Sequence, residues 1–332
     1  MVGSEKTFII NGDSINTYSR SKPVFRAGAN YQIAEATYIR SSWGEGFRFP
    51  SMAEMFISTN YSGIEIYANP ELKPETGWST EIGIKQGLKF GNWMGYLDAA
   101  AFLMEYDDMM EFNFGSWGEI VNYTVDPISN ELLVEGVGFK SLNVGKTRVS
   151  GIEFSLTGHG DITRDVGINI LAGYTYMNTK SLEPNSIYYE NTYLAAAEGI
   201  IIDTITEYLT YSNSSSDTSV LKYRYKHIAK LDAELTYKKF SLGTSFRYND
   251  FMKNIDAAFV SPLLAGYIPD IIESRSKFIN GDFIVDIRTS YQLNDITKIS
   301  LIVNNLLNKE YMTRPATMMP PRTIALQCNM KI

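Results

Sequence analysis

Residues 322–332 read RTIALQCNMKI, and every second side chain from position 324 onward is apolar. These apolar residues are Ile324, Leu326, Cys328, Met330 and Ile332. Because successive side chains of a β-strand point to opposite faces, the alternation predicts a strand with one dry face and one wet face. The fold depends on what the dry face contacts.

The same period-two alternation recurs along most of the chain. It covers, among others, residues 25–32, 78–85, 152–157, 166–176, 229–237, 240–249 and 283–291. One face of these segments carries polar or charged residues, as Lys230, Asp232 and Glu234 illustrate, which predicts antiparallel strands with one solvated face. Counted from Val24, the sequence predicts about eleven strands.

Strand length and loop length distinguish a membrane barrel from a soluble β-sandwich. The predicted strands run to roughly ten residues, the span that a tilted strand needs to cross a bilayer, whereas sandwich strands are about half as long. Short links at 32–35, 87–92, 158–164, 237–240 and 292–297 alternate with long loops near 44–76, 114–143, 179–221, 253–281 and 308–321. This pattern is typical of an outer-membrane β-barrel, with lipid on the apolar face and water on the charged face. In the third long loop, SNSSSD at 212–217 predicts a mobile tip.

Composition argues against several other classes of protein. A net charge of −7 is opposite to the basic surface that nucleic-acid binding requires, so no nucleic-acid partner is expected. The single cysteine, Cys328, excludes an internal disulfide and a thiolate zinc cluster. With His159 and His227 as the only histidines, we expect no metal site and no cofactor. No apolar run is long enough for a transmembrane helix, and the first residues, MVGSEKTFIINGDS, lack the pattern of a signal peptide.

An enzyme is not expected either. Asp107 and Asp108 are adjacent and would point to opposite faces of a strand, so they cannot act as a carboxylate pair. Asp232 and Glu234 are explained more simply as lumen charges. The loop acids also lack the spacing of a calcium-binding motif; those considered are Asp107, Glu111 and Asp126.

Four motifs follow one another in order along the chain. They are YIRSSWGEGFRFPSMAEMF at 38–56, NPELKPETGWSTEIGIKQG at 69–87, NVGKTRVSGIEFS at 143–155 and IVNNLLNKEYMTRPATMMPPRTIAL at 302–326. Together they closely resemble the C-terminal half of the TonB-dependent outer-membrane receptors, from about Pro23 onward. We interpret the motif residues as turn and packing devices of the barrel, and expect Glu75 to pair with a basic lumen residue. The matching positions are Arg48, Pro50, Asn69, Pro70, Pro74, Glu75, Asn305, Asn308 and Tyr311.

This resemblance implies an all-β fold, an antiparallel transmembrane β-barrel of about 22 strands whose last strand pairs with the first. The chain is then expected to hold about half of the barrel, without the plug domain. Residues 1–22 are expected to be a polar loop remnant and residues 23–332 the C-terminal part of the barrel. The last residue, Ile332, stands where the family usually has an aromatic residue that the barrel-assembly machinery recognises.

The resemblance also implies a function, the uptake of a large nutrient across the bacterial outer membrane. The energy would come from the TonB–ExbB–ExbD complex, acting through an N-terminal region outside this chain, and the surroundings would be outer-membrane lipid. The nutrient is left open among ferric siderophores, haem, cobalamin, glycans and peptides, and the alternative is a passive porin or an adhesin-type barrel. Aromatic residues of the long loops are the candidate ligand contacts, although ordinary loop packing or rim anchoring is the favoured explanation for them. They are Tyr61, Tyr67, Trp117, Tyr123, Tyr188 and Tyr189.

Overall fold

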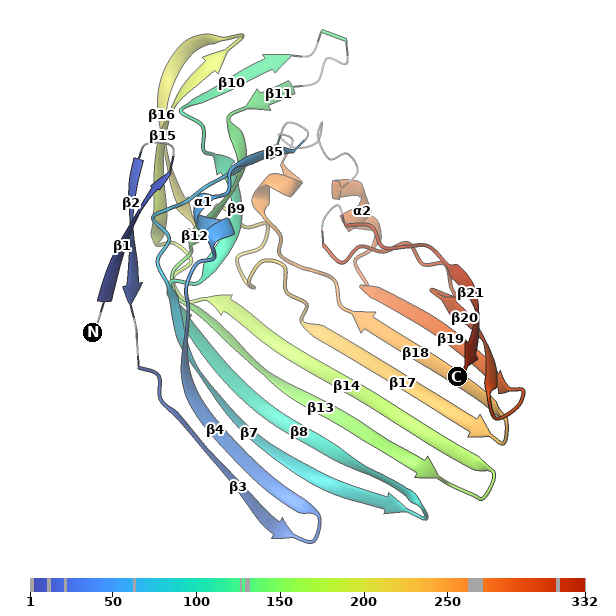
Figure 1. Cartoon of the computed structure of the whole chain (residues 1–332). Coiled ribbons are helices and arrows are strands. Elements are labelled where there is room, and N and C mark those ends of the chain that lie inside the picture. Colours follow the sequence, from blue (N-terminus) through green and yellow to red (C-terminus); the bar gives the residue numbers. More distant parts are fainter. Residues whose placement is uncertain are drawn as a thin grey trace.

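Eleven antiparallel strands form one large curved sheet in the computed structural model, which describes residues 3–10, 13–20, 23–61, 64–125, 127–128, 132–261, 271–314 and 317–331 (Figure 1). Side chains are described from residue 23 onward, except those of Tyr61 and Ile64. The wall strands are β3 (Arg26–Ala34), β4 (Thr37–Arg48), β7 (Glu75–Phe90), β8 (Trp93–Asp107), β13 (Thr147–Asp161), β14 (Val166–Ser181), β17 (His227–Tyr237), β18 (Phe240–Asn249), β19 (Asp282–Gln292), β20 (Thr297–Asn304) and β21 (Thr323–Met330). Each pairs with its neighbours in chain order, so the prediction of about eleven antiparallel strands is confirmed. The edge strands β3 and β21 do not pair with each other, and the barrel is not closed.

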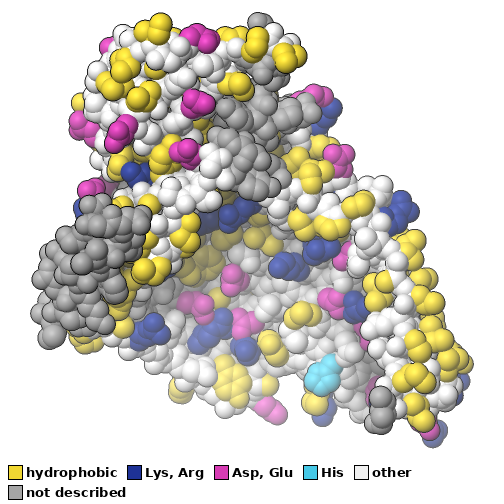
Figure 2. All heavy atoms as spheres, turned by 45° about the horizontal axis from the view of Figure 1, so that its top comes forward, with side chains coloured by type: hydrophobic (Ala, Val, Ile, Leu, Met, Phe, Trp, Pro, Cys, Tyr) yellow, Lys and Arg dark blue, Asp and Glu magenta, His cyan; other side chains and the backbone are white. Residues whose placement is uncertain are grey.

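The wall has the two faces that the alternation predicts. On β21, Ile324 is 70% exposed and Leu326 is 78% exposed, and they pair with Val303 and Leu301 of β20, so this apolar face packs into no protein core among the described residues. Outward apolar side chains recur on other wall strands, for example Ile82, Phe154 and Leu301. The opposite face is concave, and Figure 2 shows basic and acidic side chains together in the hollow. Among the described residues, no helix has the length and hydrophobicity needed to cross a bilayer.

Short turns join the wall strands at one end of the sheet. They occupy residues 35–36, 91–92, 162–165, 238–239 and 293–296, close to the predicted positions. The first prediction was wrong in detail, because β3 continues to Ala34 instead of turning at residues 32–35. A register shift between Gln32 and Ala34 marks a β-bulge, and its extra residue breaks the alternation just before the turn.

Long segments at the other end build a cap from the residues 49–74, 108–146, 182–226, 250–281 and 305–322, here called the loop cap. Its described residues contain two four-stranded sheets and three short helices. One sheet comprises β5 (Thr59–Tyr61), β6 (Ile64–Tyr67), β12 (Val137–Asn143) and β9 (Met110–Ser116); the other comprises β11 (Leu132–Glu135), β10 (Ile120–Val125), β15 (Ile187–Ala197) and β16 (Ile200–Thr210). The helices are α1 (Met52–Phe56), the 3₁₀ helix η1 (Ala257–Val260) and α2 (Ile271–Lys277). A separate hairpin, β1 (Gly3–Ile10) with β2 (Asp13–Arg20), lies within the first 22 residues.

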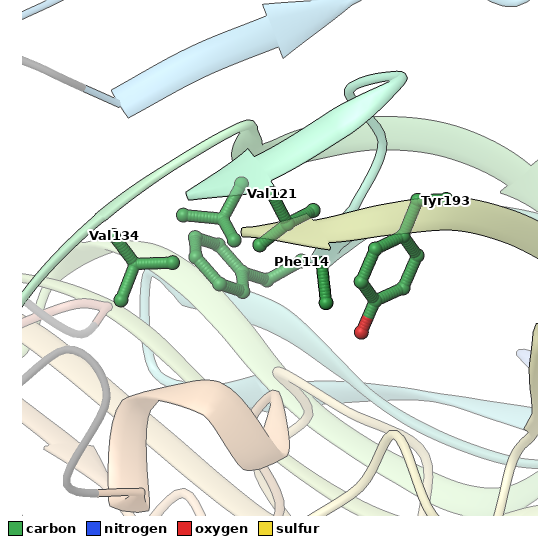
Figure 3. Packing of buried hydrophobic residues seen from close by; sticks show 6 residues of the cluster. Phe114, Val121, Val134 and Tyr193 are labelled. Carbon is green, nitrogen blue, oxygen red and sulfur yellow. The ribbon is translucent and has the colours of Figure 1, made fainter. Parts of the chain in front are cut away.

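Most of the buried apolar side chains among the described residues lie in the loop cap, and few lie in the wall. Phe114, Val121, Val134 and Tyr193 pack together from strands β9, β10, β11 and β15 (Figure 3). Wall strands need little internal core because lipid covers their outer face. The loop cap therefore folds like a small soluble domain on top of the barrel wall.

The prediction of a mobile tip at residues 212–217 was wrong. Ser214 and Ser215 are buried, and Ser215 forms a β-bridge with Asp256. The Ser216 hydroxyl and the Asp217 backbone N–H both donate to the side-chain oxygen of Asn254. A polar composition predicts solvent exposure only when no buried polar partners are available, and the neighbouring loop supplies them here.

Candidate ligand site

Two arginines of the wall each reach across a glycine to acids on a strand two places away. Arg288 on β19 passes over Gly243 on β18 and binds Asp232 on β17 through both terminal nitrogens, at 2.7 and 2.8 Å. Arg40 on β4 passes over Gly83 on β7 and reaches Asp98 on β8 at 2.7 Å. These bidentate and bridging ion pairs line the hollow side of the sheet.

A cavity of about 300 Å³ opens between four segments of the loop cap. Aromatic rings form much of its lining: Phe112 and Phe139 stack with centroids 4.9 Å apart, and Phe259 lies 5.9 Å from Phe139. Arg224 and Arg314 line the same cavity, and both are exposed. A flat ligand could lie against these rings and meet both guanidinium groups.

Neither arginine forms an ion pair within the part of the chain that the structure describes. No carboxylate there lies within ion-pair distance of Arg224 or Arg314. Arg224 donates a 3.4 Å hydrogen bond to the Tyr223 carbonyl, and the Arg314 guanidinium lies 5.9 Å from the Tyr223 ring. Two cations beside one aromatic cavity favour an anionic ligand.

Lys222 also lines this cavity, and its side chain is fully buried. Its Nζ donates to the Asn113 side-chain oxygen at 2.5 Å and lies 3.4 Å from Asp256 and 3.6 Å from Glu111. Ser214 supplies two further oxygens at 3.3 Å. Since these partners come from β9, from residues 182–226 and from the residues before η1, one ammonium group connects three segments of the loop cap.

Burial determines the ionisation of the groups around Lys222. It raises the pKa of the Glu111 carboxyl above its usual value, and the charge of Lys222 only partly opposes this effect. Glu111 Oε2 also has no hydrogen-bond donor among the described residues. Burial likewise raises the pKa of Tyr188 and Tyr211 well above the ordinary value, so that both hydroxyl groups remain protonated.

Four of the six predicted aromatic contacts come together, but none of these four lines this cavity. Tyr67, Trp117, Tyr188 and Tyr189 pack around Leu142 and Leu209, and Lys140 donates to the Tyr189 hydroxyl at 2.9 Å. Tyr123 packs against the cluster of Figure 3. The side chain of Tyr61 lies outside the described residues.

The two arginines of the cavity were missed by the sequence reasoning. A signal for one of them existed in KYRYK at 222–226, where basic and aromatic residues alternate. Arg314 gave no comparable signal, because it stands alone between Thr313 and Pro315 in a motif interpreted as a turn.

The first motif residues hold the beginning of the loop cap. Asn69 is buried, and its amide donates to the Ser141 carbonyl at 2.8 Å. Glu75 accepts from the Met110 backbone N–H at 2.9 Å and lies 3.9 Å from Arg48, the basic partner that the sequence led us to expect. Pro50 directly precedes Ser51, the N-cap of α1, while Pro70 and Pro74 flank the return to β7.

The last motif shapes the return from β20 to β21. Asn305 and Asn308 both have φ of 50°, the left-handed conformation in which asparagine is enriched. Asn305 is buried; its side chain accepts from the Lys309 N–H and donates to the Lys309 carbonyl, both at 2.8 Å. Asn308 accepts from the Arg322 N–H at 2.9 Å, and Tyr311 is buried beside them.

The sequence of this chain matches a protein-family model and is similar to parts of two known proteins. A family model described as "TonB dependent receptor-like, beta-barrel" matches residues 5–306. Hemoglobin and hemoglobin-haptoglobin-binding protein A of Haemophilus influenzae is 20% identical over 216 residues, 62% of this chain and 19% of that protein. The vitamin B12 transporter BtuB of Vibrio vulnificus (strain YJ016) is 31% identical over 111 residues, 31% of this chain and 16% of that protein.

Solved structures share the fold over nearly the whole chain. The ferric-catecholate import receptor Fiu from Escherichia coli K12 has a TM-score of 0.56 at 20% identity, covering 96% of this chain and 35% of that one. The siderophore receptor PiuA from Acinetobacter baumannii has a TM-score of 0.53 at 19% identity, covering 96% of this chain and 36% of that one. The chain thus spans about a third of these structures and under a fifth of the two curated relatives.

Proposed function

Because this chain belongs to the TonB-dependent receptor β-barrel family, whose barrels lie in the bacterial outer membrane, we propose that it serves in the active uptake of a large nutrient. Its part in that process is binding and gated passage, without covalent chemistry. The proposed energy source is the TonB–ExbB–ExbD complex, engaged through an N-terminal region of the receptor. The barrel-assembly machinery and outer-membrane lipid are the other proposed partners.

The arginine-bearing aromatic cavity carries the proposal about the nutrient. Arg224 and Arg314 supply positive charge without a described carboxylate partner, and Phe112 and Phe139 supply flat apolar surface. A ligand that combines negative charge with aromatic rings would satisfy both features, because each charge-assisted hydrogen bond to arginine is stronger than a neutral one. We therefore propose an anionic chelate or macrocycle, and rank ferric complexes of aromatic chelators and haem above neutral glycans.

Uptake by the complete receptor tests this proposal. The probes are ferric tris-(2,3-dihydroxybenzoate), haemin and cyanocobalamin, measured in cells without competing receptors. We expect at least one anionic probe to enter, to stop entering when a protonophore collapses the proton-motive force, and to enter roughly tenfold more slowly in the variant R224Q/R314Q. Lys226→Gln is the matched control, since Lys226 lies two residues after Arg224 but does not line the cavity. An entry rate that the protonophore does not change would instead support the passive porin.

A further inference from the structure

The sheet made of β11, β10, β15 and β16 stands at the end of the molecule farthest from the short turns (Figure 1). It carries charge of only one sign. The sequence has no Lys, Arg or His in residues 90–139 or 181–221, which include all four strands. Glu119, Glu135, Glu190, Glu198 and Asp203 are exposed there, and Figure 2 shows acidic and apolar side chains together on this lobe.

Strand β16 is an edge of that sheet and pairs only with β15. The turn after β16 shows which of its N–H and C=O groups face away from β15. The Asn213 side chain donates to the Tyr208 carbonyl at 2.7 Å and accepts from the Thr210 N–H at 2.9 Å. Asn213 thus takes the place of a neighbouring strand, which indicates that the even-numbered residues of β16 direct their N–H and C=O groups away from β15.

Part of this edge has no backbone partner within the described residues. The N–H of Thr204 is taken by the Asp203 carboxylate at 2.8 Å, but no backbone hydrogen bond outside the pairing with β15 reaches Thr206. Pairing is regular from Asp203 to Leu209, and a bulge at Ile202 shifts the register before the pairing continues toward the tip. A short, regular row of open hydrogen-bonding groups is a template for another strand.

The side chains along the edge determine which kind of strand can pair with it. Asp203 and Glu207 lie on one face of the regular stretch, while Thr204, Thr206 and Tyr208 lie on the other. Tyr208 is 50% exposed, and the isoleucines at 200–202 extend the apolar surface toward the tip. Directly opposed like charges destabilise a strand pair, so a second copy of this acidic edge is disfavoured and a basic strand is favoured.

We propose that the outer edge of β16 docks a cationic polypeptide segment, which adds to the sheet as a further β-strand with basic residues toward Asp203 and Glu207 and apolar residues toward Tyr208. This docking is independent of the nutrient cavity, whose lining includes no residue of β16. It gives the receptor a protein-recognition surface on the loop cap.

Fluorescence anisotropy on the purified receptor carrying the full chain, in detergent micelles, tests the proposal. The probe is a labelled ten-residue peptide of alternating lysine and valine. Two comparison peptides have alternating glutamate and valine, or the same lysines and valines in two blocks. We expect saturable, salt-sensitive binding of the alternating cationic peptide alone, and roughly tenfold weaker binding to the variant D203N/E207Q.

Substitutions at Thr206 separate strand addition from simple charge attraction. Thr206→Pro removes an outward N–H without removing a hydrogen bond to β15, whereas Thr206→Val keeps the N–H and loses only the hydroxyl contact with Thr192. We expect T206P to weaken binding by about tenfold and T206V to bind like the unmodified receptor. Equal binding to T206P, equal binding of the block peptide, no saturable binding, or a receptor dimer that T206P dissociates would each overturn the proposal.

Discussion

Asn305 supports the final loop through its side chain. The amide exchanges two 2.8 Å hydrogen bonds with the backbone of Lys309, and the residue occupies a left-handed conformation. Alanine loses both hydrogen bonds and tolerates that conformation less well than asparagine. We expect Asn305→Ala to lower the free energy of unfolding by about 3 kcal/mol. The measurement is urea unfolding in phospholipid bilayers, together with the rate of tryptic cleavage at Lys309 and Arg322.

Asn304→Ala is the matched control for that experiment. Asn304 is the preceding asparagine, it is exposed on β20, and its side chain makes one 3.2 Å hydrogen bond to Thr323. Its loss is expected to cost less than about 0.5 kcal/mol and to leave the loop resistant to trypsin. Equal effects of the two substitutions would show that the buried hydrogen bonds of Asn305 do not hold the loop.

Gly243 allows Arg288 to cross from β19 to the acids of β17. A Cβ at position 243 would collide with the Nε of Arg288, so alanine displaces the guanidinium from Asp232 and Glu234. These ion pairs face the hollow and are partly solvated, and we expect Gly243→Ala to lower the free energy of unfolding by only about 1 kcal/mol. The difference should shrink at high salt. Gly173→Ala is the control, because the nearest atom to its added Cβ lies 3.9 Å away. If both variants lost the same unfolding free energy, the loss would come from replacing glycine by alanine in a strand and not from displacing Arg288.

Residue types alone predicted the turn motifs better than they predicted the cavity. The asparagines at 305 and 308 could be interpreted as turn residues because their left-handed conformation is a local property. The loop aromatics could not be divided into packing and exposed residues, since this depends on neighbours far along the chain. Trp117, for example, donates to the Gly138 carbonyl and packs edge-on against Tyr189. The contacts around the arginines are equally non-local.

At the scale of elements, the wall was predictable and the loop cap was not. Each wall strand lies between lipid and water, so its own sequence must alternate, and pairing follows chain order. In the loop cap, β6 pairs in parallel with β12, and β10 pairs in parallel with β15, across long sequence separations. No local pattern specifies such partners. The central side chains of the cap are also distant in sequence, as Lys222 and Asn113 are 109 residues apart.

The charge on Glu111 should make the stability of the cap depend on pH. Its pKa is raised in the folded chain because burial disfavours the ionised form, although Lys222 and Arg224 oppose this effect while Asp256 reinforces it. The unfolded chain therefore releases this proton more readily. The stabilising contribution is complete below pH 4.5, the ordinary value, and is lost as the pH rises through the higher folded pKa. Each tenfold increase in proton affinity corresponds to about 1.4 kcal/mol.

Hydrogen exchange of the amides that join β9 to β12 measures this dependence. After correction for the intrinsic exchange rate, we expect the opening free energy to fall from pH 4.5 toward pH 8 in the unmodified chain and to stay nearly constant in Glu111→Gln. Glu54 and Asp217 have lowered pKa values and act in the opposite direction, but they lie at α1 and near Lys253. Asp217→Asn is the control, and the β9 amides of that variant should keep the pH dependence. An unchanged profile in E111Q would contradict the assignment.

At the scale of the whole molecule, the two open edges limit what this chain can do by itself. Strands β3 and β21 each pair on one side only within the described structure. In hydrocarbon, each unsatisfied backbone group costs several kcal/mol, and a sheet that spans a membrane must close on itself. A row of such groups along an eight-residue strand exceeds the total stability of an ordinary domain, which is about 5–15 kcal/mol. The curved wall therefore requires further strands on both edges before it can serve as a transmembrane pore.

SDS gel electrophoresis of the 332-residue chain, refolded into bilayers, tests this requirement. Closed barrels resist SDS and therefore migrate differently before and after boiling. We expect the chain alone to migrate identically in both states, since an open sheet lets detergent reach its unpaired edges. Co-refolding with a segment that supplies the missing strands should produce a heat-sensitive band at the combined mass. A heat-sensitive band at twice the mass of this chain would show that two copies complete one barrel. A heat-sensitive monomer would contradict the argument, since β3 and β21 would then have to pair with each other.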